Sequence, residues 1–378
     1  MEWFPKHFEV SRGGNASGVR PMEGLRGFAV FLVFLVHYVT VVKPWLAPDS
    51  SLMSIADGIH TIGNTGVDLF FVLSGYLIYG SLISRPLNLK RFMFRRIIRI
   101  YPAFIAVFVV YLALSFALPS MSKIPKTTLQ GSIYLIQNFL LFPGLFPIAP
   151  MIIVAWSLSY EMFYYLVMPL IIIALGLRRR NYLWRGGLFL LIAVAILFLC
   201  ATLVWPIRLA RLVMFIAGIL LYDASQSGRV PTPSNSIAVL ALVSGLLAML
   251  LPWTGSDGSA TKVAILFVSF FIVCFSCFSD PGTWLPRMFS WTPLRWLGNM
   301  SYSYYLLHGL SLKAIFLLFA VLAPATVYGP LFFWTLLPVT FGLTLIPASA
   351  LFLLIEHPIS LAPGVRQRVK PDRGIVSD

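Results

Sequence analysis

Arg26 and His37 lie in one apolar stretch of the chain, and their spacing suits chemistry on a long substrate. They are eleven residues apart, and at about 100° per residue this makes three helical turns plus about 20°, so both point to one face. The rise between them is about 16 Å. A guanidinium near one end and an imidazole farther in would bind an anionic head group and act on a reactive tail. The alternative is an Arg that extends to the membrane surface and a His that only packs.

Two carboxylates, Asp68 and Glu161, also lie within apolar stretches. If their helices enter from the side opposite Arg26, Asp68 lies about 9 Å and Glu161 about 13 Å below that surface. His37 lies about 20 Å from the other surface of an apolar layer about 30 Å thick. All three groups then share one layer, where an unpaired carboxylate costs several kcal/mol. We therefore predict a catalytic group of His37, Asp68 and Glu161, with a structural ion pair as the alternative for each carboxylate.

A strongly basic segment, residues 90–99, precedes the third apolar stretch and ends in Arg96 and Arg99. At a spacing of i,i+3 the two side chains share a helix face. Paired guanidiniums bind phosphate oxygens in bidentate geometry. We predict that Arg26, Arg96 and Arg99 bind a phosphate-bearing substrate. The alternative for residues 90–99 is an ordinary cytoplasmic loop whose positive charge only orients the protein.

The elements that hold these residues must be membrane helices. Of 378 residues, 59% are hydrophobic and 11% are charged, whereas soluble domains carry about 25% charged residues. We predict an all-α transmembrane bundle, with a short interfacial or re-entrant helix at Leu129–Phe142, between a cytoplasmic segment 1–23 and a cytoplasmic tail 356–378. The ten predicted spans are 24–43, 62–83, 100–118, 152–175, 187–205, 209–222, 236–252, 262–279, 300–323 and 330–355.

The net charge of +15 is distributed as in a membrane protein. With a cytoplasmic N-terminus, the predicted inner segments carry 20 Lys and Arg residues, and the outer segments with their flanks, including Lys43 and Lys262, carry 6. This bias places both termini in the cytoplasm, and the basic residues beside apolar stretches favour contacts with membrane lipids over nucleic acid. Cys274 and Cys277 lie in an apolar helix without polar neighbours, so we predict packing and no metal site.

Six segments that contain these residues resemble the signatures of the acyltransferase-3 family of bacterial membrane O-acyltransferases. In chain order they are 24–37, 66–76, 95–102, 156–161, 302–308 and 355–358. Their order and spacing match the family over essentially the whole chain. One small departure is His357, since the family more often has Arg before the proline.

The resemblance implies a multi-pass protein of the bacterial inner membrane that uses acyl-CoA, usually acetyl-CoA, as its donor. It implies no permanently bound cofactor, and a carbohydrate or glycolipid acceptor, such as a cell-surface polysaccharide, lipopolysaccharide or lipid-linked precursor. Many members carry an additional SGNH domain. Because 23 residues follow Ile355, we expect the chain to deliver the acyl group itself or to pass it to polysaccharide-assembly proteins.

Three further groups follow less directly from the sequence. Tyr302 and His308 match the family pattern, and we predict that they line a donor channel or pack helices, because His308 is only about 12 Å from the inner face. The alternative is a direct role in the chemistry. Lys313 is eleven residues beyond Tyr302, hence on nearly the same face. It could contact a polar acceptor or extend to the surface, and we leave it out of the predicted site.

The sequence therefore predicts an acyltransferase in which His37, uncharged at its depth, removes a proton from an acceptor hydroxyl or forms an acyl-histidine. Asp68 or Glu161 orients the imidazole or binds the acceptor. The alternative is a transporter or flippase, in which the same buried groups form a substrate or proton path. A purely structural membrane subunit rarely retains so many buried ionisable groups.

Overall fold

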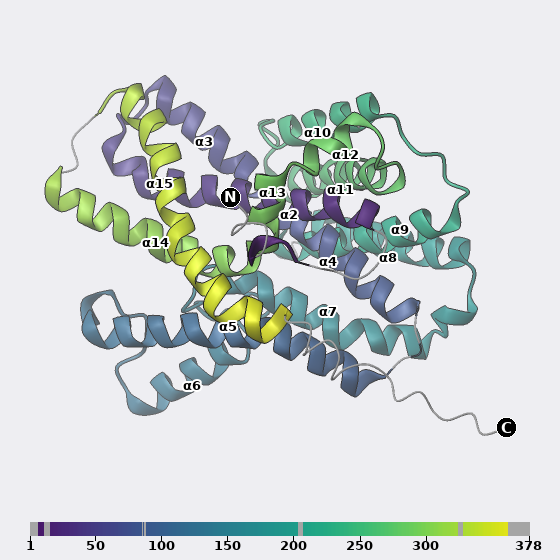
Figure 1. Cartoon of the computed structure of the whole chain (residues 1–378), viewed down its shortest axis with the longest axis horizontal. Helices are drawn as coiled ribbons and strands as arrows, with labels where there is room; N and C mark the ends of the chain where they lie inside the picture. Colours follow the sequence, from purple (N-terminus) through teal and green to yellow (C-terminus); the bar gives the residue numbers. More distant parts are fainter. Residues whose placement is uncertain are drawn as a thin grey trace.

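The computed structural model describes residues 7–10, 16–84, 86, 88–202, 207–323 and 328–361, and within these ranges every element is helical (Figure 1). Nine helical segments of this part are long and apolar enough to cross a membrane. The α-helices of ten residues or more are α2 (Ala16–Val42), α3 (Ser51–Gly63), α4 (Thr65–Ile83), α5 (Leu89–Ala117), α6 (Thr128–Phe139), α7 (Ala155–Ala174), α8 (Tyr182–Thr202), α9 (Val213–Ser227), α10 (Asn235–Ala248), α11 (Gly255–Ser279), α14 (Ser301–Leu322) and α15 (Pro330–Leu351). The predicted all-α membrane bundle is confirmed.

Several predicted boundaries differ from the structure. The predicted seventh span is α10, which has 14 residues and rises only about 21 Å. The predicted loop 84–99 becomes helical at Leu89, because the side chain of Asn88 accepts from the Arg91 amide at 2.9 Å and caps α5. The predicted cytoplasmic loop 280–299 holds two short helices, α12 (Trp284–Phe289) and α13 (Thr292–Asn299). Residues 203–205 of the fifth span lie outside the described residues.

The last helix is longer than its apolar run indicates. After α15 the chain continues as a π-helix, η5 (Phe352–Leu361), through Glu356 and Pro358. The sequence boundary at residue 355 therefore falls inside a helix, and Glu356 is buried. The remainder of the predicted tail, 362–378, lies outside the described residues.

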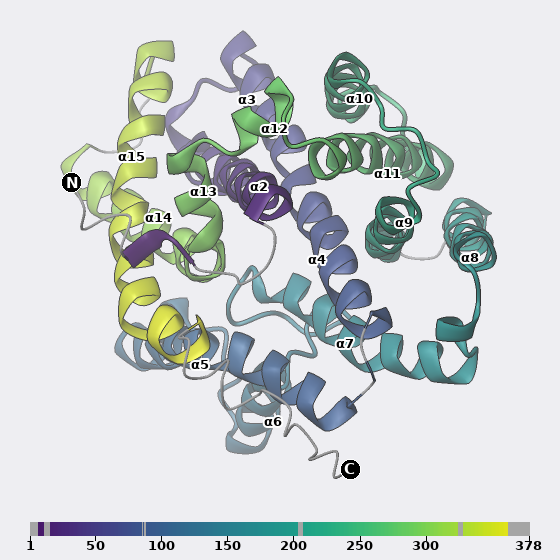
Figure 2. The same ribbon diagram turned by 45° about the vertical axis from the view of Figure 1, so that its right-hand side comes forward.

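α2 lies in the middle of the molecule (Figure 2). Helices α8 to α11 form a group on one side of it, and α14 and α15 lie on the other. α2 packs against α4, α13 and α14, and α4 packs against α9. The first two residues predicted to do chemistry, Arg26 and His37, are thus on a helix with neighbours on several sides.

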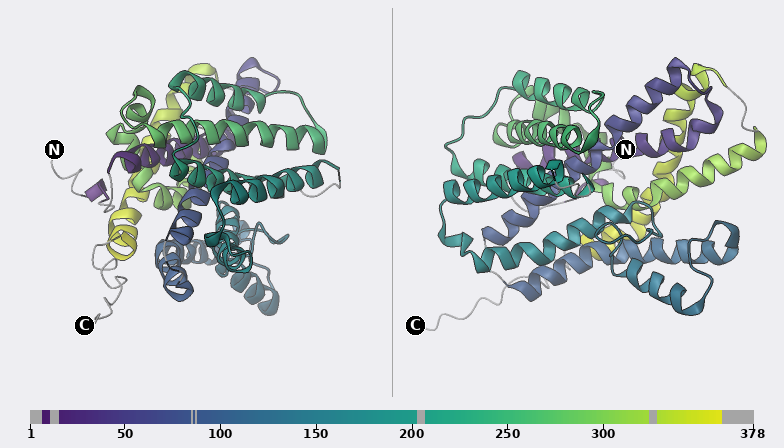
Figure 3. Two further views of the ribbon diagram at one scale, coloured as in Figure 1. Left: turned by 90° about the vertical axis from the view of Figure 1, so that its right-hand side faces the viewer. Right: turned by 180° about the vertical axis from the view of Figure 1, so that it is seen from behind.

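α6 confirms the predicted short helix, with 12 residues instead of a span's length. It lies beside α5 in views from the front and from behind (Figure 3). The ring of Phe139 packs against Tyr101 and Phe108 of α5, with ring centroids 5.6 and 5.9 Å away. Three prolines after α6 prevent its continuation as a span.

Candidate functional site

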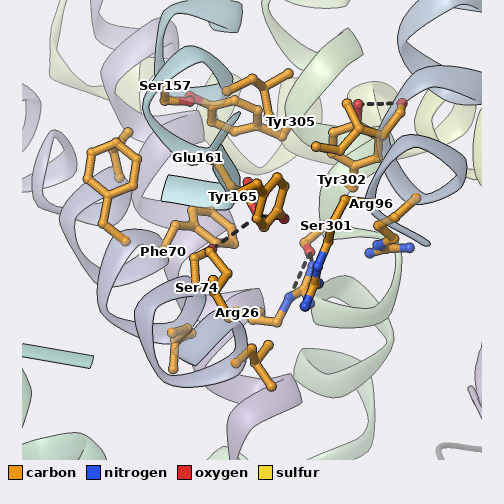
Figure 4. A pocket seen from close by; sticks show the side chains of 18 residues that line it. Arg26, Phe70, Ser74, Arg96, Ser157, Glu161, Tyr165, Ser301, Tyr302 and Tyr305 are labelled. Carbon is orange, nitrogen blue, oxygen red and sulfur yellow. Dashed lines mark hydrogen bonds between the residues drawn. The ribbon is translucent and has the colours of Figure 1, made fainter. Parts of the chain in front are cut away.

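A cavity opens between α2, α4, α5, α7 and α14, and all three predicted phosphate-binding arginines line it. Figure 4 shows Arg26 and Arg96 on its wall. Its polar lining consists of Arg26, Ser74, Arg96, Arg99, Ser157, Glu161, Tyr165, Ser301, Tyr302 and Tyr305. Three guanidiniums face a single lining carboxylate, so the cavity favours an anion. We call it the arginine cavity.

Arg26 is held at the start of α14. Its Nε and Nη2 donate to Ser301 Oγ at 3.2 and 2.9 Å, as the dashed lines in Figure 4 show. The contact joins α2 to α14 and orients the guanidinium of Arg26 within the cavity. Ser301 had no distinctive signal in the sequence, apart from preceding the predicted Tyr302.

Arg96 is sandwiched by aromatic rings and incompletely hydrogen-bonded. Its guanidinium carbon lies 5.0 Å from the ring centroids of both Phe92 and Tyr165, and its Nη2 donates to Ser81 Oγ at 3.1 Å. Its Nε is buried and has no hydrogen-bond acceptor among the described residues. A buried donor without a partner costs about 1–3 kcal/mol, and a phosphate oxygen in the cavity would remove that cost.

Arg99 is positioned by a carboxylate that was not among the predicted site residues. Its Nη1 donates to Oε1 of Glu356 at 2.6 Å. Glu356 has no exposed side-chain surface, and its Oε2 also accepts from the amide and the hydroxyl of Ser303 at 3.0 and 2.5 Å. The one signal for Glu356 was its place in the closing signature, directly after the last apolar run.

Glu161 lies on the wall of the arginine cavity. Its Oε1 accepts from the hydroxyls of Tyr165 and, at 3.5 Å, of Ser74. It makes no hydrogen bond to His37, which does not line this cavity. Although His37 and Glu161 were predicted to share one layer, they are therefore not in direct contact. Glu161 can instead contact a substrate bound in the cavity.

Asp68 is engaged in an ion pair away from the cavity. Arg211, in the short helix η4 (Ile207–Leu212), lies 3.0 Å from each of its carboxylate oxygens. Arg211 also donates to the carbonyl of Asn64 at 3.0 Å and stacks over Trp156. This geometry favours the structural alternative for Asp68, since the pair ties α4 to η4 and no contact of Asp68 with His37 exists in the described residues.

His37 pairs with His308, across 271 residues of sequence. Nε2 of His308 lies 3.2 Å from Nδ1 of His37, and Nδ1 of His308 lies 3.0 Å from the Tyr304 carbonyl. This contact between the two histidines contradicts the predicted difference in depth, which put His37 about 20 Å and His308 about 12 Å from the inner face. His308 is fully buried and lies behind the cavity wall, whereas Tyr302 lines the cavity.

The hydrogen bonds assign the tautomers of this histidine pair. The Tyr304 carbonyl only accepts, so Nδ1 of neutral His308 carries the hydrogen and its Nε2 is an acceptor. His37 must then donate from Nδ1, which it shares with the Val33 carbonyl at 3.0 Å. Nε2 of His37 is left with a lone pair and has no hydrogen-bond partner in the described part of the chain. This nitrogen is the one able to accept a proton or attack a carbonyl.

Tyr305 connects the histidine pair to the arginine cavity. It lines the cavity and exchanges a hydrogen bond of 2.7 Å with Ser157. Its ring centroid lies 6.0 Å from that of His308. The histidine pair thus lies one side chain beyond the cavity wall. Among the described residues no group of three or more His, Cys, Asp or Glu is arranged to hold a metal ion.

A family model described as an acyltransferase domain matches residues 21–352. The chain belongs to the acyltransferase-3 family. This membership confirms the resemblance, and the match covers the first five of the six sequence segments. The match covers every residue of the arginine cavity and both histidines.

Individual relatives are distant. Peptidoglycan O-acetyltransferase OatA of Listeria monocytogenes is 28% identical over 325 residues, which cover 77% of this chain and 49% of OatA. The protein YrhL of Bacillus subtilis is 26% identical over 76% of this chain and 47% of its own length. An uncharacterized Haemophilus influenzae protein is 38% identical over 28% of this chain and 48% of its own length. The chain spans about half the length of these relatives, and no solved structure matches it.

Proposed function

We propose that the protein is an acyl-CoA-dependent O-acyltransferase of the bacterial inner membrane, and that it moves an acetyl group to a sugar hydroxyl. The observation that carries this proposal is the convergence of Arg26, Arg96 and Arg99 on one cavity whose far wall adjoins His37 and His308. The name of the Listeria relative, a peptidoglycan O-acetyltransferase, supports an acetyl group and a saccharide acceptor.

The donor would bind with its nucleotide phosphates against the three guanidiniums, because Arg recognises phosphate in bidentate geometry. Its narrow pantetheine arm would extend past Tyr305 toward the histidine pair. The helical rise of about 16 Å between Arg26 and His37 is a length that such an arm can bridge. The buried Nε–H of Arg96 supports this placement, since it needs an acceptor.

The transfer itself would use Nε2 of His37. This nitrogen takes the proton of the acceptor hydroxyl as the oxygen attacks the thioester carbonyl. The carbon–sulfur bond then breaks, and the CoA thiolate receives the proton from His37. A route in which Nε2 first takes the acyl group, releases CoA and passes the group to the hydroxyl uses the same atoms. In both, His308 accepts the hydrogen bond from Nδ1–H and stabilises the positive imidazole.

Purified protein with labelled acetyl-CoA in detergent tests the proposal. We expect release of free CoA together with label in an added saccharide or glycolipid acceptor. A transporter or flippase, the competing function, would release no CoA and label no product. Mass spectrometry of surface glycans from deletion and wild-type cells would then identify the acceptor, and co-purification would identify any polysaccharide-assembly partners.

A further inference from the structure

A second groove lies at the other end of α5 from the arginines. It is formed by the C-terminal part of α5, residues 121–123 and 151–153, and the middle of α14. Arg99 is 18 residues before the end of α5 at Ala117, a rise of about 27 Å, and Lys123 follows that end. The groove and the arginine cavity therefore open toward opposite ends of the bundle.

Two lysines face this otherwise mostly apolar groove, Lys123 and Lys313. Lys123 Nζ donates to the Pro150 carbonyl at 3.0 Å, which uses one of its three hydrogens. Within the described residues, neither lysine forms a salt bridge with a carboxylate. Lys313 lies in the spanning helix α14, where an uncompensated charge is costly.

The two ammonium groups repel each other. Partial burial and the charge of Lys313 lower the pKa of Lys123 from its ordinary value. Two cations held together in a groove with apolar walls are satisfied by one anion between them. A ligand that also covers the apolar walls, which include Leu310 and Leu317, must carry a hydrocarbon part next to its negative charge.

Gly309 separates this groove from His37. It lines the groove, and a Cβ built on it would lie 3.7 Å from Cδ2 of His37. Cδ2 is bonded to Nε2, the nitrogen with the lone pair. With no side chain at position 309, a group in the groove reaches the reactive edge of the imidazole.

We propose that this groove is the acceptor subsite, and that Lys123 and Lys313 bind the phosphate of a lipid-linked saccharide. The inference rests on the proposed function and adds the place where the acceptor binds and the residues that bind its phosphate. The lipid lies along the apolar walls, the phosphate lies between the ammonium groups, and a sugar hydroxyl reaches Nε2 of His37 past Gly309. A neutral soluble sugar would need neither the charges nor the apolar walls.

Binding of a fluorescent polyprenyl phosphate to the full-length protein in detergent tests this. We expect the phosphate to bind at least about tenfold more tightly than the matching polyprenyl alcohol, as for charge-assisted hydrogen bonds. The double variant Lys123→Gln/Lys313→Gln should lose that preference, and the double Lys→Arg variant should keep it. Lys262→Gln is the matched control, because Lys262 donates to the Met249 carbonyl and lies outside the groove.

The outcomes separate this proposal from the proposed function. Equal binding of phosphate and alcohol, or unchanged binding by the folded Gln variant, would overturn the subsite. Displacement of the probe by inorganic phosphate at equal concentration would also overturn it, since the ligand would then be a free anion. If the lysines are required for phosphate binding but no variant or wild-type protein releases CoA from acetyl-CoA, the anion site stands and the acyltransferase function fails.

Discussion

At the scale of single residues, the proposed chemistry depends on one nitrogen, Nε2 of His37. Its lone pair follows from a chain of hydrogen bonds that starts at the Tyr304 carbonyl. We expect His37→Ala to reduce transfer by about 100-fold or more, since removal of a general base has that effect. The measurement is transfer of labelled acetyl groups by purified protein of unchanged unfolding temperature. Activity within about tenfold of wild type would contradict the role of His37.

His308 is a positioning residue in this scheme. His308→Ala should lower kcat by about tenfold to a hundredfold, because a hydrogen bond to a charged group is lost, and KM for acyl-CoA should change little. His308→Gln should retain more activity, because a glutamine oxygen can accept from Nδ1–H of His37. Equal activity of the two variants would show that His308 only fills space.

The cavity arginines act far from the reacting bond. We expect Arg96→Ala and Arg99→Ala to raise KM for acyl-CoA more than they lower kcat. Lys90→Ala is the matched control, because Lys90 lies in the same basic segment but is exposed and does not line the cavity. If all three variants share the wild-type KM, the segment serves only to orient the protein.

At the scale of helices, α14 links both proposed substrate sites. Ser301, Tyr305 and His308 follow one another at i,i+4 and i,i+3, so they share a face. That face carries a contact to Arg26, a wall of the arginine cavity and the partner of His37. Gly309 and Lys313, on the adjoining face, line the groove. Small shifts of this helix would therefore alter donor and acceptor binding together.

The contact between α4 and α9 is made by glycines. A Cβ at Gly218 would lie 2.0 Å from the Val72 carbonyl oxygen, and one at Gly75 would lie 2.1 Å from that of Phe215. We expect Gly218→Leu to lower the unfolding temperature in detergent, because overpacking costs about 1–3 kcal/mol or more. Gly187→Leu on α8 is the control, as nothing lies within 4 Å of a Cβ there. Equal unfolding temperatures would mean that the two helices separate readily.

At the scale of the whole molecule, the arginine cavity and the groove that holds Lys123 and Lys313 approach the histidine pair from opposite ends. The charge bias of the loops predicts that the arginine end is cytoplasmic. Sealed vesicles of known orientation test this, with a membrane-impermeant acyl-CoA added outside. Inside-out vesicles should transfer the acyl group and right-side-out vesicles should not. Equal activity in intact vesicles of both kinds would refute the sidedness.

The sequence alone determined the features that depend on one helix at a time. Apolar run lengths predicted a membrane bundle, and helical periodicity placed Arg26 with His37, and Arg96 with Arg99, on common faces. The family signatures extended this to the acyltransferase-3 family. These inferences succeed because they depend only on local backbone geometry and on the cost of polar groups in lipid.

Only the tertiary structure decided which groups meet. Asp68 pairs with Arg211, 143 residues away, Arg99 with Glu356, 257 residues away, and His37 with His308, 271 residues away. The relative depth of two helices depends on where each one begins and on how closely they pack, as at the glycine contacts between α4 and α9. Our depth estimates assumed that every helix starts at one of the two membrane surfaces. They therefore separated His308 from His37 and placed Asp68 in the same layer as His37. Packing between distant segments, which no local pattern encodes, determines these partners.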